Sequence, residues 1–171
     1  MKKTIANTTV ISNFAAVRRL DLLHSLLGRL HISSEVYEEI RQGLAEGYDF
    51  YEGIEGLIYP FSAEGWIELV SLEGVEELRR YGEVPDRLHR GEASCLVIAR
   101  EREWALLTDD QEARKMAREW KIEFSGTLGV LVRCVEMGLL ALEDGNNLLQ
   151  RMIKQANYRT PYTDLAMLLE V

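Results

Sequence analysis

Four short stretches of this sequence hold oxygen-bearing side chains of the kind that bind hard metal ions. They are Asn7-Thr8-Thr9, Glu38-Glu39, Glu92 and Thr108-Asp109-Asp110. Carboxylates gathered at one place repel each other unless a cation lies among them, and oxygen-only clusters suit Mg²⁺ or Mn²⁺. A cation held in this way can bind phosphate oxygens and activate water for in-line attack. The residue types therefore predict a Mg²⁺ or Mn²⁺ site, provided that the fold brings the four stretches together.

Each stretch also has a simpler structural explanation. Asp109 or Asp110 could be the N-cap of a helix, and Glu92 would be favoured near the positive end of its own helix. Glu38 and Glu39 could lie on a solvated helix face. Taken singly, these explanations are the more common ones, so the chemical interpretation depends on the residues acting as a set.

The elements that would position these residues alternate between strand and helix. Short apolar runs predict strands over residues 3–6, 29–32, 66–70, 104–108 and 121–124. Helical spacing and capping residues predict helices over 20–27, from Ser33 or Ser34 onward, and over 74–81, 91–102, 111–120, 127–137, 143–154 and 161–171. Residues 43–60 contain four glycines and end in proline, which predicts a broken helix or a loop.

This alternation is typical of a parallel sheet covered by helices on both faces. We therefore predict the α/β fold class: a three-layer α/β/α sandwich around a central parallel sheet of about five strands, with residues 1–171 forming a single domain. Sheets of this kind bind ligands beyond the carboxyl ends of their strands. Asn7 directly follows the first strand, and Asp109 and Asp110 follow the fourth, so we expect their oxygens and those of Glu39 and Glu92 to converge on one cleft.

The composition is that of an ordinary globular protein with an excess of acidic side chains. Hydrophobic residues make up 47%, and 28 Asp and Glu against 20 Lys and Arg give a formal net charge of −8. This balance argues against a protein that coats nucleic acid by charge alone, but it leaves room for an enzyme that contacts nucleic acid through metal ions. Nine of the acidic residues lie between Gln42 and Leu78, where there is no Lys or Arg, and we expect most of that segment to be a solvated face.

Several other classes of site and compartment are disfavoured. Cys95 and Cys134 lie in apolar helical patterns and are expected to be buried free thiols in a reduced compartment. The opening MKKTIANTTVISNFAA imitates a signal peptide, but its apolar part is broken by polar residues. No run approaches the ~20 apolar residues of a membrane span, so we expect a cytoplasmic protein with no membrane partner. The three histidines lack zinc-type spacing, and no Walker-type phosphate loop is present.

Two further groups of polar residues lie near the expected site. A basic cluster in the helix over 111–120 and just after it is expected to be a solvated face, with phosphate contact as the alternative: Arg114, Lys115, Arg118 and Lys121. Ser125 and Thr127 are expected to cap a helix, with substrate contact as the alternative.

The ordered set of motifs resembles the PIN-domain family, in the branch related to VapC-type toxins of prokaryotic toxin–antitoxin pairs. The resemblance covers nearly the whole chain and depends on six pieces: Asn7-Thr8-Thr9-Val10-Ile11, Arg19-Leu20-Asp21-Leu22-Leu23, Val36-Tyr37-Glu38-Glu39-Ile40, Gly91-Glu92-Ala93, Leu106-Leu107-Thr108-Asp109-Asp110 with Ala113-Arg114, and Gly126-Thr127-Leu128-Gly129-Val130-Leu131. It implies a flavodoxin-like α/β/α sandwich and a Mg²⁺- or Mn²⁺-dependent ribonuclease. Relatives of this kind commonly pair with an antitoxin and form homodimers, so RNA, an antitoxin and a second copy are the implied partners.

The resemblance also assigns positions to the site. It places the first acid at Asn7, the second at Glu39, the third at Glu92 and the last at Asp109, with Asp110 as the alternative because alignments can shift by one. Two hydroxyls would support the site, those of Thr9 and Thr108. A docking surface for a basic antitoxin is the alternative role of the acidic segment over 42–78.

The first position departs from the family, which normally has Asp where this chain has Asn7. An amide oxygen can ligate a hard cation, but it brings no negative charge to offset it. One alternative is therefore a degenerate PIN module that binds RNA or a protein partner without efficient cleavage. Another is an unrelated flavodoxin-like domain with a small-molecule ligand. The absence of a glycine-rich phosphate loop after the first strand argues against this alternative.

Overall fold

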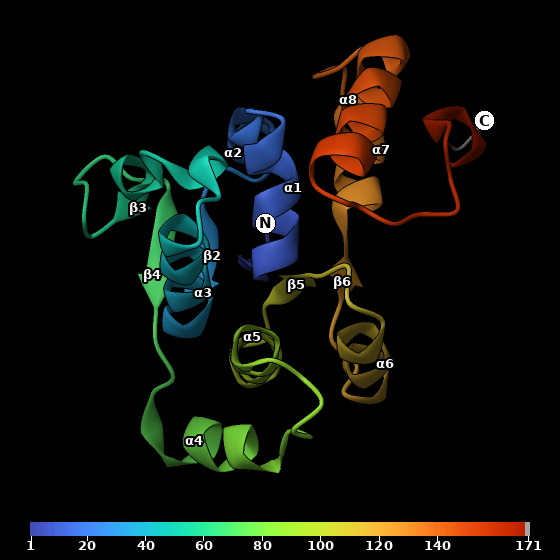
Figure 1. The fold of residues 1–171 in the computed structure, drawn as a ribbon. Coiled ribbons are helices and arrows are strands. Elements are labelled where there is room, and N and C mark those ends of the chain that lie inside the picture. Colours follow the sequence, from blue (N-terminus) through green and yellow to red (C-terminus); the bar gives the residue numbers. More distant parts are fainter. Residues whose placement is uncertain (170–171) are drawn as a thin grey trace.

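A computed structural model describes residues 1–169 and consists of one parallel sheet between layers of helices (Figure 1). The strands are β1 (Thr4–Ala6), β2 (Leu30–Ser33), β3 (Ile58–Tyr59), β4 (Ile67–Val70), β5 (Ala105–Leu107) and β6 (Phe124–Ser125). They lie in the order β3-β4-β2-β1-β5-β6, and every neighbouring pair is parallel. The predicted α/β fold class is confirmed, with six strands where about five were expected.

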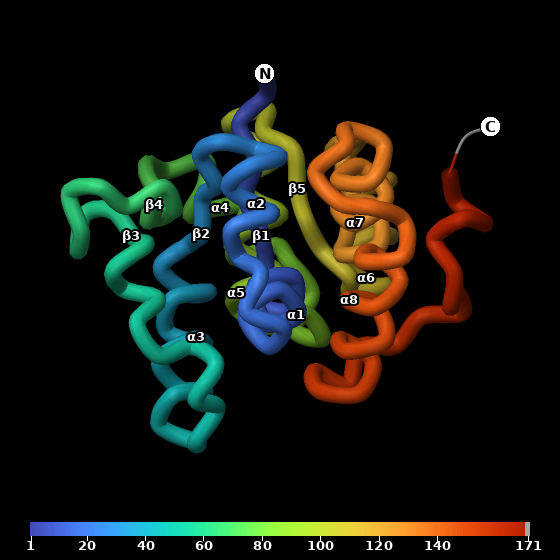
Figure 2. Tube along the Cα trace, turned by 90° about the horizontal axis from the view of Figure 1, so that it is seen from above, coloured from blue at the N-terminus to red at the C-terminus, as the bar shows by residue number. Residues whose placement is uncertain are grey.

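Two helical layers cover the sheet. On one side α1 (Thr8–Ala16), α2 (Leu20–Leu27), α7 (Thr127–Glu136) and α8 (Leu142–Gln155) contact one another. On the other side α5 (Arg90–Glu101) contacts α3 (Ser34–Ala45), α4 (Gly74–Glu83) and α6 (Gln111–Glu119). Figure 2 shows β3 near one end of the molecule and the C-terminal segment at the opposite end. No helix among residues 1–169 is long and apolar enough to cross a membrane.

The core lies against the central strands β1 and β2, whose residues are all buried. Helix α5 is buried along most of its length, because it lies across these strands with helices on either side. Cys95 of α5 and Cys134 of α7 are buried and free, as expected. Parallel strands buried on both faces favour apolar residues, and Ile5, Ala6, Leu30 and Ile32 supply them here, while Thr4, His31 and Ser33 are buried polar residues.

Helix α1, strand β3 and the C-terminal segment differ from the sequence-based expectation. Helix α1 was not anticipated, because its cap Asn7 and its polar residues Thr8, Thr9, Ser12 and Asn13 obscure the apolar stripe. Strand β3 has only two residues and lies in the segment expected to be broken helix or loop, together with short 3-10 helices over Asp49–Tyr51 and Ile54–Leu57.

The predicted helix over 161–171 is wrong for the described residues. Within 161–169 the only helical segment is a single 3-10 turn over Leu165–Met167, begun by Asp164, whose side chain accepts from the Ala166 amide. Leu165 is fully buried and packs against α8, so the apolar residues of this segment cover the bundle as a strap instead of forming a helix stripe. The last two residues of the prediction lie outside the described part of the chain.

One buried histidine lies inside the sheet. The ring of His31 in β2 is 2% exposed, its Nδ1 lies 3.0 Å from the Thr4 carbonyl oxygen, and its ring centroid lies 4.4 Å from that of Trp104. Its Nε2 has no hydrogen-bond partner among the described residues, and Glu68 Oε2 lies 3.5 Å away. Burial lowers the pKa of His31 below its usual value, although the Thr4 carbonyl and the charge of Glu68 act in the opposite direction.

We expect His31 to make the fold sensitive to mild acid. Because the pKa of His31 is lower in the folded than in the unfolded chain, its contribution to stability is complete above the ordinary imidazole pKa of 6.5 and is lost as pH falls below it. Urea unfolding at a series of pH values should show a steeper loss of stability in the parent chain than in His31→Phe. His24→Phe, at an exposed histidine that stacks on Trp66, is the control. Equal slopes in the parent and His31→Phe would contradict this assignment.

Candidate functional site

The register of β1 and β5 brings Asn7 next to Thr108 at the carboxyl end of the sheet. Ala6 of β1 pairs with Leu107 of β5, and the Asn7 amide donates to the Leu107 carbonyl at 3.0 Å. Each of these strands ends there, and the chain turns into a helix. The two polar stretches that follow β1 and β5 in the sequence are therefore neighbours in space, as expected of a parallel sheet.

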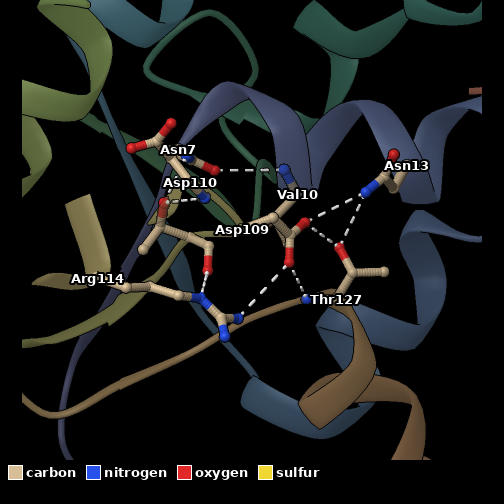
Figure 3. A network of polar contacts seen from close by, with 8 residues as sticks. Asn7, Val10, Asn13, Asp109, Asp110, Arg114 and Thr127 are labelled. Carbon is tan, nitrogen blue, oxygen red and sulfur yellow. Dashed lines mark hydrogen bonds and ion pairs between the residues drawn. The ribbon is translucent and has the colours of Figure 1, made fainter. Parts of the chain in front are cut away.

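The side chain of Asn7 is 1% exposed, and both of its polar atoms make hydrogen bonds (Figure 3). Its Oδ1 accepts from the Val10 amide at 3.3 Å and thereby caps helix α1. Its Nδ2 donates to Thr108 Oγ1 at 2.8 Å. An amide oxygen has two lone pairs, so Oδ1 keeps the capacity for one further contact.

Glu39 projects from α3 toward the start of α1. Thr8 Oγ1 donates to Glu39 Oε2 at 3.2 Å, while Glu39 Oε1 is shielded from solvent and has no hydrogen-bond partner among the described residues. Burial raises the pKa of Glu39, and the bond from Thr8, the charge of His89 and the nearby backbone amide of Gly91 lower it only in part. A buried carboxylate oxygen without a donor is costly, so this atom favours the arrival of a cation or a donor.

Gly91 provides the room that Glu39 occupies. A Cβ atom at Gly91 would lie 2.0 Å from Glu39 Oε1, well inside contact distance. Gly91 is therefore required for close approach of the α5 backbone to the carboxylate and not for an unusual backbone conformation.

Glu92 lies one residue further along α5, in its first turn. Its Oε2 accepts from the His89 amide at 3.0 Å. Burial raises the pKa of Glu92, and the negative charges of Asp110 and Glu39 raise it further. Three carboxylates from α3, α5 and the start of α6 therefore interact electrostatically across this end of the sheet.

A pocket of about 240 Å³ unites four of the sequence-predicted residues. Its lining is Asn7, Thr8, Thr9, Glu39, His89 and Glu92. Thr9 lines the pocket, but the hydroxyl that contacts a carboxylate is that of its neighbour Thr8. The pocket is thus built from the start of α1, the middle of α3 and the start of α5.

Asp109 lies apart from this pocket. Its Oδ1 accepts from the Thr127 amide at 2.8 Å, and its Oδ2 accepts from Thr127 Oγ1 at 2.5 Å and from Asn13 Nδ2 at 3.2 Å. Arg114 Nη2 lies 3.8 Å from Oδ1, and Figure 3 shows the carboxylate turned toward Asn13 and Thr127. Burial raises the pKa of Asp109, although these donors oppose the shift. Asp109 lines a second pocket, of about 510 Å³, with Arg114.

Asp110 faces the other way. Its Oδ1 accepts from the Ala113 amide at 2.7 Å and caps α6, and its own amide donates to Thr108 Oγ1 at 3.2 Å. Thr108 therefore binds Asn7 and Asp110 through one hydroxyl, and the charge of Asp110 is felt at Glu92. Of the two adjacent acids, Asp110 is therefore the one that lies on the side of the Asn7 amide and the Glu92 carboxylate.

Two expectations about neighbouring residues are corrected. Arg114 is not on a solvated face, because its Nε donates to the Thr108 carbonyl at 3.0 Å and its side chain is only 26% exposed. The other basic residues of that cluster are exposed, namely Lys115, Arg118 and Lys121. Thr127 begins α7, but its hydroxyl bonds to Asp109, so it ties the helix to the strand end.

Sequence reasoning did not anticipate the contact of Thr8 with Glu39 or the space that Gly91 leaves for that carboxylate, and it missed Asn13. Asn13 is 1% exposed and lies between the buried Val10, Ile11 and Phe14 of α1. A polar residue on an otherwise apolar helix face is the signal that could have indicated it.

The oxygen donors of the pocket are of the type that a divalent cation prefers, but their total negative charge is small. Among residues 1–169 there is no group of three or more His, Cys, Asp and Glu side chains placed to hold a metal ion. Instead two carboxylates, Glu39 and Glu92, share the pocket with the Asn7 amide and two threonines. The oxygen donors of Asn7, Glu39 and Glu92 fit a hard cation, and the missing third carboxylate in this pocket would make its binding weak.

The comparisons with known proteins agree with the fold. Among solved structures, a PilT N-terminus domain protein from the archaeon Sulfolobus solfataricus P2 is similar, with 13% sequence identity, a TM-score of 0.51, and coverage of 78% of this chain and 93% of that chain. VapBC2 from Rickettsia felis, bound to a DNA fragment from its promoter, gives 14% identity and a TM-score of 0.49, with 72% and 97% covered. No match was found among curated proteins.

At these identities the likeness to solved structures concerns the fold alone. The decisive comparison is the model of a family described as PIN domain, which matches residues 3–170. Almost the whole chain is matched, in agreement with the resemblance carried by its sequence motifs. The chain therefore belongs to the PIN-domain family.

Proposed function

We propose that this protein is a metal-dependent ribonuclease of PIN type, in which Asn7, Glu39, Glu92 and Asp110 hold Mg²⁺ or Mn²⁺. The observation that supports it most is the pocket that three separate elements build and that Asn7, Glu39 and Glu92 line together. The metal-dependent activity that the family resemblance implies supplies the reaction class. A bound divalent cation would polarise the phosphodiester and activate water for in-line hydrolysis.

Asp110 suits the fourth place better than Asp109. The carboxylate oxygens of Asp109 already accept three hydrogen bonds, from Thr127 and Asn13. The Asp110 carboxylate accepts one hydrogen bond, from the Ala113 amide, and its charge acts on Glu92. We assign Asp109 to positioning α1 and α7 against the end of β5, and Asp110 to the metal-holding set.

The remaining residues of the pocket would hold the acids in place. Thr8 donates to Glu39 and leaves Oε1 facing the Gly91 backbone, while the backbone amide of His89 holds Glu92. Thr108 links Asn7 to Asp110 through its hydroxyl. In this arrangement the threonines position acids and are not catalytic residues.

A second candidate function is a PIN module that binds RNA or a protein partner with little cleavage. The specific observation in its favour is that Asn7 is neutral and uses both polar atoms in structural bonds. Two carboxylates in the pocket offset the charge of one divalent cation, which leaves little attraction for a second.

The toxin–antitoxin setting belongs to the same proposal. An antitoxin partner, a homodimer, a cytoplasmic location and a single domain over residues 1–171 are what the resemblance to VapC-type proteins implies. A chain that functions as a toxin should arrest growth when expressed alone and should be neutralised by co-expression of a cognate basic partner.

Asn7→Asp should strengthen both metal binding and cleavage. The new carboxylate adds a negative charge at the pocket, and Thr108 Oγ1 can rotate to donate to it, so we expect Mn²⁺ affinity to rise by about tenfold, or about 1.4 kcal/mol. Calorimetry with Mn²⁺ and cleavage of single-stranded RNA are the measurements. Asn147→Asp, an exposed position on α8, adds the same charge elsewhere as the control.

Equal, robust cleavage by the parent chain and Asn7→Asp would overturn the view that Asn7 weakens the site. If the parent binds no Mn²⁺ at millimolar concentration while Asn7→Asp does, the second candidate function is favoured for the natural sequence.

Substitution of the two adjacent aspartates should affect different properties, the stability of the fold for Asp109 and the cleavage activity for Asp110. Asp109→Asn places an amide against the Thr127 donors, so we expect a loss of about 1–3 kcal/mol in the free energy of unfolding. Asp110→Asn keeps a good N-cap for α6, so it should unfold like the parent chain but lose cleavage and lower the pKa of Glu92. Urea titration, RNA cleavage and carboxyl NMR titration measure these effects. A stable, inactive Asp109→Asn beside an active Asp110→Asn would reverse the assignment.

Gly91→Ala should disable the site by displacing Glu39. The added Cβ would lie 2.0 Å from Glu39 Oε1, so the carboxylate must move, and we expect cleavage to fall by about a hundredfold. Gly82→Ala in α4, where a Cβ meets nothing within 4 Å, is the matched control. Thermal unfolding of both variants separates a local displacement from loss of the fold. Full activity in a folded Gly91→Ala would show that Glu39 has no role.

A further inference from the structure

A large pocket adjoins the carboxylate pocket, and most of its lining has no role in the chemistry above. It measures about 760 Å³ and lies between α3, the start of α1 and the segment over 48–51. Thr8 and Glu39 line both pockets, so the two adjoin at these side chains. A ligand that reaches Glu39 with one group could therefore place a neighbouring group in this larger space.

One wall of this pocket is aromatic. The ring of Tyr48 is 54% exposed, and its centroid lies 5.8 Å from that of Phe50, which in turn lies 4.5 Å from Tyr51. Tyr51 is fixed from below by a hydrogen bond between its hydroxyl and Ser12. Gly43 lets these rings approach α3, because a Cβ there would meet Tyr51 at 2.9 Å. A planar ligand can stack on such a wall.

Four of the five charged side chains in the pocket are carboxylates, which accept hydrogen bonds: Glu35, Glu38, Glu39 and Glu46. Glu35 Oε2 is shielded from solvent with no donor among the described residues. The amide of Gln42 is already used, since its Nε2 donates to Glu46 at 2.8 Å. Arg90 is the one basic residue in the lining. The pocket therefore suits a ligand whose edge donates hydrogen bonds.

We propose that this pocket binds the guanine base of a single-stranded RNA, next to the phosphodiester held at the carboxylate site. Guanine presents two adjacent donors, N1–H and the N2 amino group, which a single carboxylate can accept together. Adenine and cytosine place an acceptor nitrogen beside their one amino group, and uracil places carbonyls on both sides of its N–H, so a carboxylate repels part of each edge. Single-stranded bases are read in this way, by stacking on aromatic rings and by bonds to the Watson–Crick edge.

The adjacent carboxylate site favours a base over a basic side chain of a protein, which would also satisfy carboxylates. A nucleotide has its phosphate and base one sugar apart, and the shared lining by Thr8 and Glu39 provides that connection. This inference builds on the proposed ribonuclease function but is testable without it, because a nucleoside has no phosphate.

NMR titration with guanosine, inosine and adenosine, in the absence of divalent metal, tests the pocket directly. We expect guanosine to shift the signals of Tyr48 and Phe50 and to bind about tenfold more tightly than inosine, which lacks the N2 amino group. Tyr48→Ala should abolish binding of all three, whereas Tyr59→Ala, a similarly exposed tyrosine outside the pocket, should not. Glu35→Gln should remove the preference for guanosine, with Glu52→Gln, which is exposed elsewhere, as the control.

The outcomes separate the pocket from the nuclease. Equal binding of the three nucleosides, or no binding of guanosine, overturns the pocket. Binding of arginine methyl ester at Tyr48 in preference to guanosine overturns it in favour of a basic side chain. Cleavage of RNA with no preference for a neighbouring guanine, and without guanosine binding, leaves the nuclease intact but removes the pocket. Guanosine binding that depends on Tyr48, without any cleavage, leaves the pocket intact but removes the nuclease.

Discussion

The hydrogen bond from Asn7 Nδ2 to Thr108 Oγ1 joins the ends of β1 and β5, at the edge of the sheet where the candidate site lies. Asn7 also starts α1, which brings Thr8 to Glu39 and Asn13 to Asp109. Thr108 in turn binds the backbone of Asp110, and its carbonyl holds Arg114. The buried Asn7 amide and the Thr108 hydroxyl therefore help to fix where α1 and α6 begin, and with them the acids that these two helices contact or carry. Since both partners are buried, losing either would leave the other unsatisfied.

The carboxylates around this junction lie close together without a compensating base in their own pocket, apart from His89 at its rim. Burial raises the pKa values of Glu39 and Glu92, and their mutual repulsion adds to the shift at Glu92. Asp109 is in a different position, because Thr127, Asn13 and Arg114 surround its oxygens. Burial therefore acts on all three carboxylates, but only Asp109 has both oxygens bound by several donors, which separates groups available for a cation from groups that maintain the fold.

The fold was largely predictable because it depends on repeated, local signals. Apolar runs alternating with helical spacing indicated the parallel sheet, and the order of the strand-following acids indicated where a site could form. Side-chain direction was not predictable in the same way. Asp109 and Asp110 are adjacent in sequence, but the cap of α6 turns one toward Glu92 while the start of α7 binds the other. Arg114 was expected in solvent, since a sequence does not reveal that a carbonyl at the end of β5 lies within its reach.

The acidic excess takes on a different meaning once its residues are located. A net charge of −8 alone argues against nucleic acid, yet much of the repulsion it implies depends on where the carboxylates lie. Glu35, Glu38 and Glu39 lie in a pocket whose aromatic wall can hold a base, and there acceptor groups attract the donor edge of that base. Phosphate repulsion matters at Glu39 and Glu92 instead, where a cation would have to reverse it. The neutral Asn7 removes one charge from that place, which lowers the repulsion toward phosphate and, by the same step, the attraction for the metal.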